Sequence, residues 1–243
     1  MFFDIVGEIN LEILSSESII EIPYLVTKDN VSKYVKEKHD ITHRQVYSTS
    51  RVGSINGMYA TSLGTGGIMP ITSNFYPTSQ FFELKLTGLQ QEVMKESMHL
   101  ALTIAWNRTS TEMQKKIRKK YEKDNCSGIN IHAGDLDVRK EGPSASIAIC
   151  CSIYSLLNDI PIKQYFGVTG ELSLTGDAMA IGGLEHKILG SIKSGATSFI
   201  YPKENARDFT DFIEKYKDKE ELKDAKFFEV STIDEVFSLI FDA

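Results

Sequence analysis

Two side chains of this 243-residue sequence could together perform hydrolytic chemistry, a serine and a lysine. Ser144 stands in the stretch RKEGPSAS (139–146), directly after a Gly-Pro turn and just before the apolar run IAICC. Pro143 fixes its own φ and Gly142 permits an unusual turn, so Ser144 has a preset position at the start of a predicted helix. Free N–H groups in a first helical turn can stabilise an oxyanion. A serine that only caps the helix would use the same groups, so both interpretations stay open.

A serine hydroxyl is a poor nucleophile unless a base takes its proton. Histidine is the usual base, but the five histidines of the sequence form no triad-like pattern with an aspartate. A lysine can serve if desolvation lowers its pKa and keeps it neutral. Lys187 lies one turn into the predicted helix LEHKILGSI, and the apolar residues that follow it indicate a partly buried helix. The residues alone leave two alternatives, a Ser–Lys hydrolase or a capping serine with a surface lysine.

Patterns for other chemistries are missing from the sequence. It contains no GxxxxGK[ST], HExxH or CxxC motif, so we predict neither a nucleotide site nor a metal centre. Three cysteines make no disulfide framework and indicate free, buried thiols. The net charge of −6 argues against a broad nucleic-acid surface, and the basic run at 115–123 is predicted to be the solvated face of a helix. No apolar run approaches the roughly 20 residues of a membrane span, and no basic leader precedes the early acids. We therefore expect an intracellular protein, cytoplasmic or in an organelle matrix.

Hydrophobic periodicity and glycine punctuation predict the elements that must position these side chains. Residues 1–50 are predicted to be an N-terminal segment and linker with a short helix around 28–37, and residues 51–243 the main domain. Strands are predicted in 51–76, with a hairpin loop at 64–67, and then at 81–88, 128–134, 165–183 (strand, turn, strand), 197–202 and 226–231. Helices are predicted at 93–105, 110–122, 144–157, 184–195, 204–216 and 232–240. Mixed strands and helices without strict βαβ alternation predict an α+β fold.

From about Arg51 to the C-terminus, the sequence resembles the proteolytic domain of Lon proteases. RVGSINGMYAT resembles the opening strand of that family, and KLTGLQQEVMKESMHLALT resembles its first long helix. INIHAGDLDVRKEGPSAS resembles the segment around the nucleophile, VTGELSLTGDAMAIGGLEHKILGSIKSG the segment with the catalytic lysine, and FIYPKENARDF its continuation. Several long motifs in one order are far more specific than any single pattern. The resemblance implies the Lon proteolytic-domain fold, α+β with small mixed sheets and packed helices, and a serine endopeptidase.

Matched position by position, the resemblance implies a role for several residues. Ser144 falls on the nucleophile of a Ser–Lys dyad and Lys187 on its general base. Thr169 matches a threonine that orients the lysine amine, whereas Glu141 and His132 match an acid and a histidine near the nucleophile. An extended peptide could pair by backbone hydrogen bonds with the strand that lines the substrate groove. That strand would comprise Met58, Tyr59, Ala60 and Thr61.

The sequence also departs from the family pattern. Ser146 stands where the pattern has a glycine two residues after the nucleophile, and Asn130 replaces the first of two histidines. Ser62 stands where many members have an acid, and the usual Gly-Gly-Leu-Lys-Glu-Lys reads GGLEHK. These changes bear on efficiency, because the dyad residues themselves are retained.

The resemblance further implies a larger assembly. Residues 20–36 resemble the end of the ATP-driven unfoldase module of Lon enzymes, so the chain looks like a C-terminal piece of a larger Lon. ATP and magnesium are implied only for that module, and no cofactor for this chain. The expected partners are unfolded or damaged polypeptides and further copies of the chain in a hexameric ring, without membrane or nucleic acid. The alternative function is an inactive Lon-type domain that serves as an assembly or interaction module.

Overall fold

The computed structural model of the chain divides into two units, Met1–Thr42 and His43–Ala243. It describes residues 44–62, 64–88, 91–124, 128–134 and 142–242, and in the first unit positions 6, 7, 9–11, 14 and 25–27. The predicted helix around 28–37, most of the resemblance at 20–36 and the candidate residue Glu141 lie outside the described residues. Residues 44–50, expected to be a linker, belong to the second unit, where the Val46 N–H donates to the Ser194 carbonyl at 2.9 Å.

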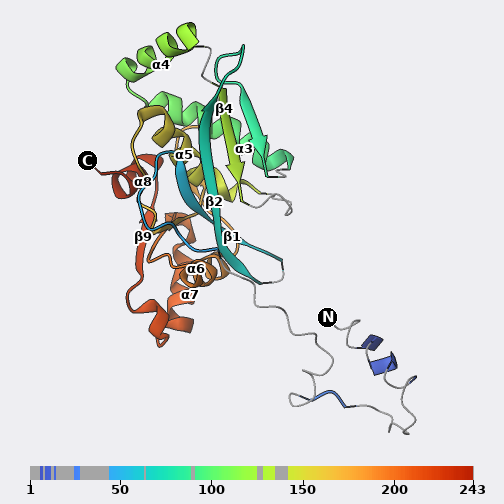
Figure 1. The fold of residues 1–243 in the computed structure, drawn as a ribbon. Helices are drawn as coiled ribbons and strands as arrows, with labels where there is room; N and C mark the ends of the chain where they lie inside the picture. Colours follow the sequence, from blue (N-terminus) through green and yellow to red (C-terminus); the bar gives the residue numbers. More distant parts are fainter. Residues whose placement is uncertain are drawn as a thin grey trace. The chain divides into compact units, whose positions relative to one another are not determined.

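A seven-stranded mixed sheet forms the centre of the second unit (Figure 1). Its strand order is β3-β4-β2-β1-β5-β8-β9, in which β1–β2 and β2–β4 are antiparallel and the other neighbours are parallel. The strands are β1 (Ser54–Ala60), β2 (Gly66–Tyr76), β3 (Leu84–Thr87), β4 (Gly128–Ala133), β5 (Phe166–Val168), β8 (Ser198–Pro202) and β9 (Lys226–Val230). A separate antiparallel pair consists of β6 (Glu171–Leu172) and β7 (Ala178–Met179). The predicted hairpin is present, because β1 pairs with β2 in register from Ser54–Thr72 to Ala60–Gly66.

The strand predicted at 81–88 is shorter than its sequence pattern suggests. Phe82 has a φ of 58°, which belongs to a tight turn, and β3 begins only at Leu84. The Phe81 and Phe82 rings stack with centroids 4.1 Å apart, and both meet the Trp106 ring edge to face. Aromatic packing in a turn thus produced an apolar alternation that resembles a strand.

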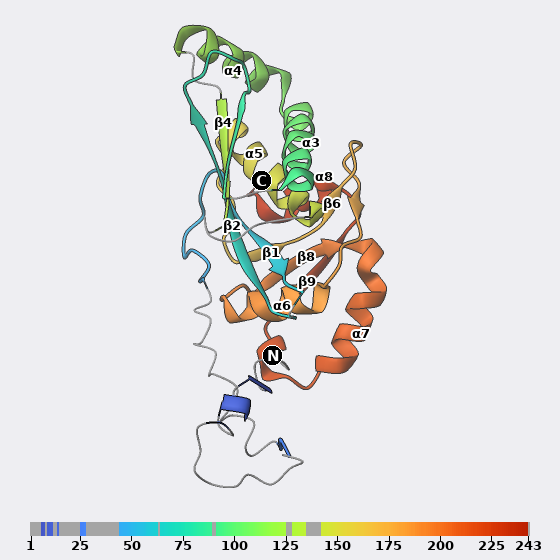
Figure 2. The ribbon, with the colours of Figure 1, turned by 90° about the vertical axis from the view of Figure 1, so that its right-hand side faces the viewer.

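Six helices are described around the sheet: α3 (Glu92–Arg108), α4 (Thr111–Asp124), α5 (Ser146–Asn158), α6 (Leu184–Lys193), α7 (Ala206–Tyr216) and α8 (Ile233–Ile240). Strand alternation separates two apolar cores. On β8, Ile200 packs into the core that holds α3, α5 and α8, whereas its neighbours Phe199 and Tyr201 pack into the core that holds α6 and α7. Figure 2 shows α3 beside α5, with α6 and α7 grouped apart from them. The predicted α+β class is confirmed.

Helix α5 is the most deeply buried helix in this arrangement. Ten of its thirteen residues are buried, because it packs against α3 on one side and against β1 and β2 on the other. Cys150 and Cys151 lie in its middle as free, fully buried thiols, as predicted, and burial raises the pKa of both. In the described part of the chain, no helix is long and apolar enough to cross a membrane. The same residues include no cluster of three or more side chains suited to a metal ion.

Candidate active site

Ser144 lies in a single 3-10 turn that leads into α5. The turn, η1 (Pro143–Ala145), follows Gly142, whose φ of 96° favours glycine. The N-cap residues of η1 and of α5 are Gly142 and Ala145, and neither makes a side-chain capping bond. Ser144 therefore occupies neither capping position, and the capping interpretation is excluded. Its side chain is half-buried at the mouth of the helix.

Thr169 connects the candidate lysine to this turn. It is the residue directly after β5, it is fully buried, and its N–H donates to the Ile200 carbonyl of β8 at 3.1 Å. Its hydroxyl accepts a hydrogen bond of 3.1 Å from Lys187 Nζ and donates one of 3.1 Å to the Ser144 carbonyl. One hydroxyl group thus connects the Lys187 amine to the turn that carries Ser144.

Lys187 is a buried lysine, not the surface lysine of the alternative interpretation. It stands in the first turn of α6, where its backbone N–H donates to the carbonyl of the N-cap residue Gly183. Only 3% of its surface is exposed, and its helix packs on β1 and β2. Burial lowers the pKa of the Lys187 ammonium from 10.5 to about 8, because a low-dielectric surrounding disfavours the charged form. With a pKa of about 8, about a tenth of the lysine is neutral at pH 7, and this fraction can accept a proton.

Gly170 allows the segment that follows β5 to approach η1, the turn that carries Ser144, closely. Its N–H donates to the Ser144 carbonyl at 2.9 Å, and its own carbonyl accepts from the Ile147 N–H at 3.2 Å. A Cβ at position 170 would lie 2.2 Å from Cδ1 of Ile147, and the φ of Gly170 is 155°. A larger residue would therefore have to displace the end of the Ile147 side chain and adopt a φ that favours glycine.

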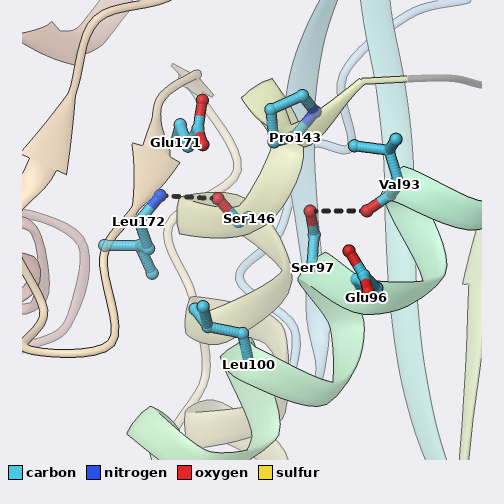
Figure 3. A pocket seen from close by; sticks show the side chains of 8 residues that line it. All are labelled: Val93, Glu96, Ser97, Leu100, Pro143, Ser146, Glu171 and Leu172. Atoms are coloured by element: carbon cyan, nitrogen blue, oxygen red, sulfur yellow. Dashed lines mark hydrogen bonds between the residues drawn. The ribbon is translucent and has the colours of Figure 1, made fainter.

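Ser146, which the sequence shows only as a departure from the family glycine, has a clear structural role. It is the first residue of α5 and is 1% exposed. Its hydroxyl accepts a hydrogen bond of 2.7 Å from the Leu172 N–H and donates one of 3.3 Å to the Gly170 carbonyl. Figure 3 shows the Ser146 hydroxyl directed at the Leu172 N–H, in the wall of a small cavity. The cavity measures about 180 Å³ and is lined by Val93, Glu96, Ser97, Leu100, Pro143, Ser146, Glu171 and Leu172.

The candidate substrate strand includes an open edge of the sheet. β5 ends opposite Gly57, so Met58–Ala60 pair with β2 on one side and have no ladder partner among the described strands on the other. Met58 is 2% exposed as a whole residue, backbone included, and packs into the core under α6, so it is covered in this structure. Tyr59 and Ala60 are half-buried, and Thr61 is exposed at the hairpin loop, where its N–H donates to the Thr65 carbonyl.

His132 lies on β4 and takes no part in the hydrogen bonds between Ser144, Thr169 and Lys187. Its ring Nδ1 lies 3.0 Å from the Thr87 hydroxyl of β3, so its described partner belongs to the neighbouring strand. The structure thus joins Ser144, Thr169 and Lys187 in one network, whereas the contacts of His132 belong to the sheet.

Comparisons with known proteins show the family to which the chain belongs. The family model of the Lon protease (S16) C-terminal proteolytic domain matches residues 25–242. The chain is 34% identical over 223 residues to the Lon protease homolog of Acanthamoeba polyphaga mimivirus, covering 90% of this chain and 21% of that protein. It is 32% identical over 231 residues to the Lon protease of Mycoplasma mobile, covering 93% and 26%, and 33% identical over 219 residues to that of Chlamydia muridarum, covering 90% and 25%. The chain therefore spans about a quarter of the length of these relatives. Since the family model covers nearly all of it, the chain belongs to the family of Lon protease C-terminal proteolytic domains.

Proposed function

We propose that this chain is a serine endopeptidase domain in which Ser144 and Lys187 form the catalytic dyad. The observation that carries the proposal is the buried Lys187 amine, hydrogen-bonded to Thr169, which is in turn hydrogen-bonded to the carbonyl of Ser144. Burial supplies a lysine that can act as a base, and the shared threonine holds it beside the turn that carries the serine. Membership of the Lon proteolytic-domain family supports the same chemistry.

The reaction begins when neutral Lys187 takes the hydroxyl proton of Ser144. The Ser144 oxygen attacks the peptide carbonyl, and the negative charge that develops on the carbonyl oxygen is held by backbone N–H groups, among them that of Ser144. Protonated Lys187 then donates its proton to the leaving amine, which gives an ester between Ser144 and the acyl half of the substrate. Lys187, neutral again, accepts a proton from water, and the resulting hydroxide equivalent attacks the ester. When the ester C–O bond breaks, Lys187 returns the proton to Ser144 Oγ and the second product leaves.

The substrate is an extended polypeptide in this proposal. The half-buried end of β1 at Tyr59 and Ala60, beyond the last residue paired with β5, can pair with a peptide backbone without regard to its sequence. Backbone pairing of this kind requires an unfolded segment, because the backbone of a folded protein is already hydrogen-bonded. The natural substrates would then be unfolded or damaged polypeptides.

In the cell, we propose that the domain is the proteolytic core of an ATP-dependent Lon protease. ATP and magnesium belong in this proposal to an unfoldase module joined to the domain, and the dyad chemistry uses only residues of this chain. The proposed partners are polypeptide substrates and further copies of the chain in a hexameric ring, inside the cell.

The test is cleavage of an unstructured fluorogenic peptide by the domain, without ATP, beside the Ser144→Ala and Lys187→Arg variants. We expect cleavage by the wild type and none by either variant, because alanine has no hydroxyl and arginine stays protonated and cannot accept the serine proton. Full activity of Lys187→Arg would exclude the lysine as base. Inactivity of all three proteins, in the domain and in a longer chain with its unfoldase, would favour the alternative, a domain kept for assembly.

A further inference from the structure

Several hydrogen bonds join η1 and the start of α5 to the segment 169–172, which follows β5. Most of them are backbone bonds, but the side chain of Ser146 also takes part. Backbone bonds run from Gly170 N–H to the Ser144 carbonyl and from Ile147 N–H to the Gly170 carbonyl. The Ser146 hydroxyl adds bonds to the Gly170 carbonyl and the Leu172 N–H. The turn that carries Ser144 and the segment 169–172 are therefore connected through Thr169, Gly170 and Leu172.

The connection at Leu172 depends on the hydroxyl of Ser146 alone. Leu172 is 3% exposed, and its N–H donates to Ser146 Oγ at 2.7 Å. A glycine or alanine at 146 would leave this buried N–H without its acceptor, and such groups are almost always paired in folded proteins. The strand would then shift to find a partner or admit water from the adjacent cavity, whose lining includes both Ser146 and Leu172 (Figure 3).

We infer that Ser146 is a positioning residue of the peptidase reaction, which holds the 169–172 segment so that Thr169 aligns Lys187 with the Ser144 turn. The inference rests on the proposed function for its catalytic consequence and on the hydrogen bonds of Ser146 for its structural basis. Ser146 itself is not a second nucleophile, because its hydroxyl is buried and engaged with two backbone groups. The family pattern has a glycine at this position, and a glycine has no side chain that could form these hydrogen bonds. This chain therefore has a connection to Gly170 and Leu172 that the usual residue cannot make.

The test compares Ser146→Ala and Ser146→Gly with a matched control, Ser152→Ala. Ser152 is another fully buried serine of α5; its hydroxyl donates a 2.8 Å hydrogen bond to the Gly53 carbonyl and lies 2.8 Å from Ser73 Oγ, so its partners differ from those of Ser146. All variants are assayed below their melting temperatures, which are measured first by circular dichroism. Two readouts follow: kcat and KM for the fluorogenic peptide, and the titration of Lys187 by NMR of 13Cε-labelled lysine, assigned with a Lys187→Met sample.

Both Ser146 variants should lower kcat about tenfold or more with KM within about twofold, because small misplacements of reacting groups are costly. The pKa of Lys187 should rise from about 8 toward 10.5 as water gains access, and neither readout should change in Ser152→Ala. Ser146 variants that lose thermal stability as the control does, but keep kcat and the Lys187 titration, would overturn the inference and leave the proposed function intact. If the wild type cleaves no peptide, the proposed function fails, and the Lys187 titration alone decides whether Ser146 positions the lysine.

Discussion

Replacing Lys187 with methionine should abolish peptide cleavage and, at neutral pH, stabilise the domain. Methionine has nearly the length of lysine without the charge, so it fills the same buried space in α6. The pKa of Lys187 falls from 10.5 to about 8 on folding, which corresponds to about 3 kcal/mol at roughly 1.4 kcal/mol per pKa unit. The variant also loses the hydrogen bond to Thr169, worth about 1 kcal/mol net. The difference leaves a gain of about 2 kcal/mol in the free energy of unfolding at pH 7.

The pH dependence of this gain has a fixed sign. Above pH 10.5 the lysine is neutral in both the folded and the unfolded chain, so its ionisation does not affect stability. Between pH 10.5 and about 8 the unfolded chain binds a proton that the folded chain does not, so the wild type loses stability as the pH falls. Below about pH 8 both forms are protonated and the cost stays constant. The advantage of Lys187→Met should therefore be largest below pH 8 and shrink as the pH rises toward 10.5.

Urea denaturation of both proteins at pH 7, 9 and 10.5 measures this difference directly. The control is Lys193→Met, an exposed lysine of the same helix, which should change the free energy of unfolding by less than about 0.5 kcal/mol. A Lys187→Met domain that is less stable than the wild type at pH 7, or whose advantage does not vary with pH, would refute the argument from burial. The same ionisation should appear in the wild-type activity, where kcat/KM rises with pH through about 8.

Three further outcomes can be checked on single variants. Thr169→Val keeps the shape of the side chain but loses both hydrogen bonds of the hydroxyl, so kcat should fall at least about tenfold, as measured with the fluorogenic peptide. Gly190→Ala would place a Cβ 2.0 Å from the Gly66 backbone, so the free energy of unfolding should fall by about 1–3 kcal/mol or more, and an unchanged urea midpoint would contradict this close packing. Cys150 and Cys151 should resist alkylation by iodoacetamide at pH 8 in the native domain and react once the domain is unfolded, because burial raises the pKa of both thiols. Rapid alkylation of the native domain would show that α5 opens.

The sequence predicts the elements of this fold better than their ends. The helices and the β1–β2 hairpin have long, regular patterns, and the structure places them within a few residues of the prediction. The strand predicted from residue 81 fails at Phe82, because a turn stabilised by stacked aromatic rings has the same alternation as a strand. Local periodicity does not distinguish the two, since the difference lies in contacts with Trp106, more than twenty residues away.

The candidate residues could be named from the sequence, but the hydrogen bonds between them could not be predicted. Apolar neighbours suggested that the helix of Lys187 was partly buried, and the structure adds the depth of burial that lowers the lysine pKa. The partnership of Thr169 with the Ser144 carbonyl joins the end of a strand to a turn, which no local pattern encodes. Ser146 was visible as an unusual residue in a familiar motif, but its buried partners at 170 and 172 could be known only from the fold.

The place of β5 in the sheet has a consequence for newly made molecules. β5 has only three residues and is held between β1 and β8 by parallel pairing, and Thr169 follows it directly. Parallel pairing joins segments that are distant in the chain and is slow to form, so Thr169 reaches its place only when the centre of the sheet has assembled. Until then the lysine is solvated and protonated, and the serine has no base. Under the proposed function, unfolded copies of the same protein are possible substrates. A newly made chain would be unable to cleave them until its own folding is complete.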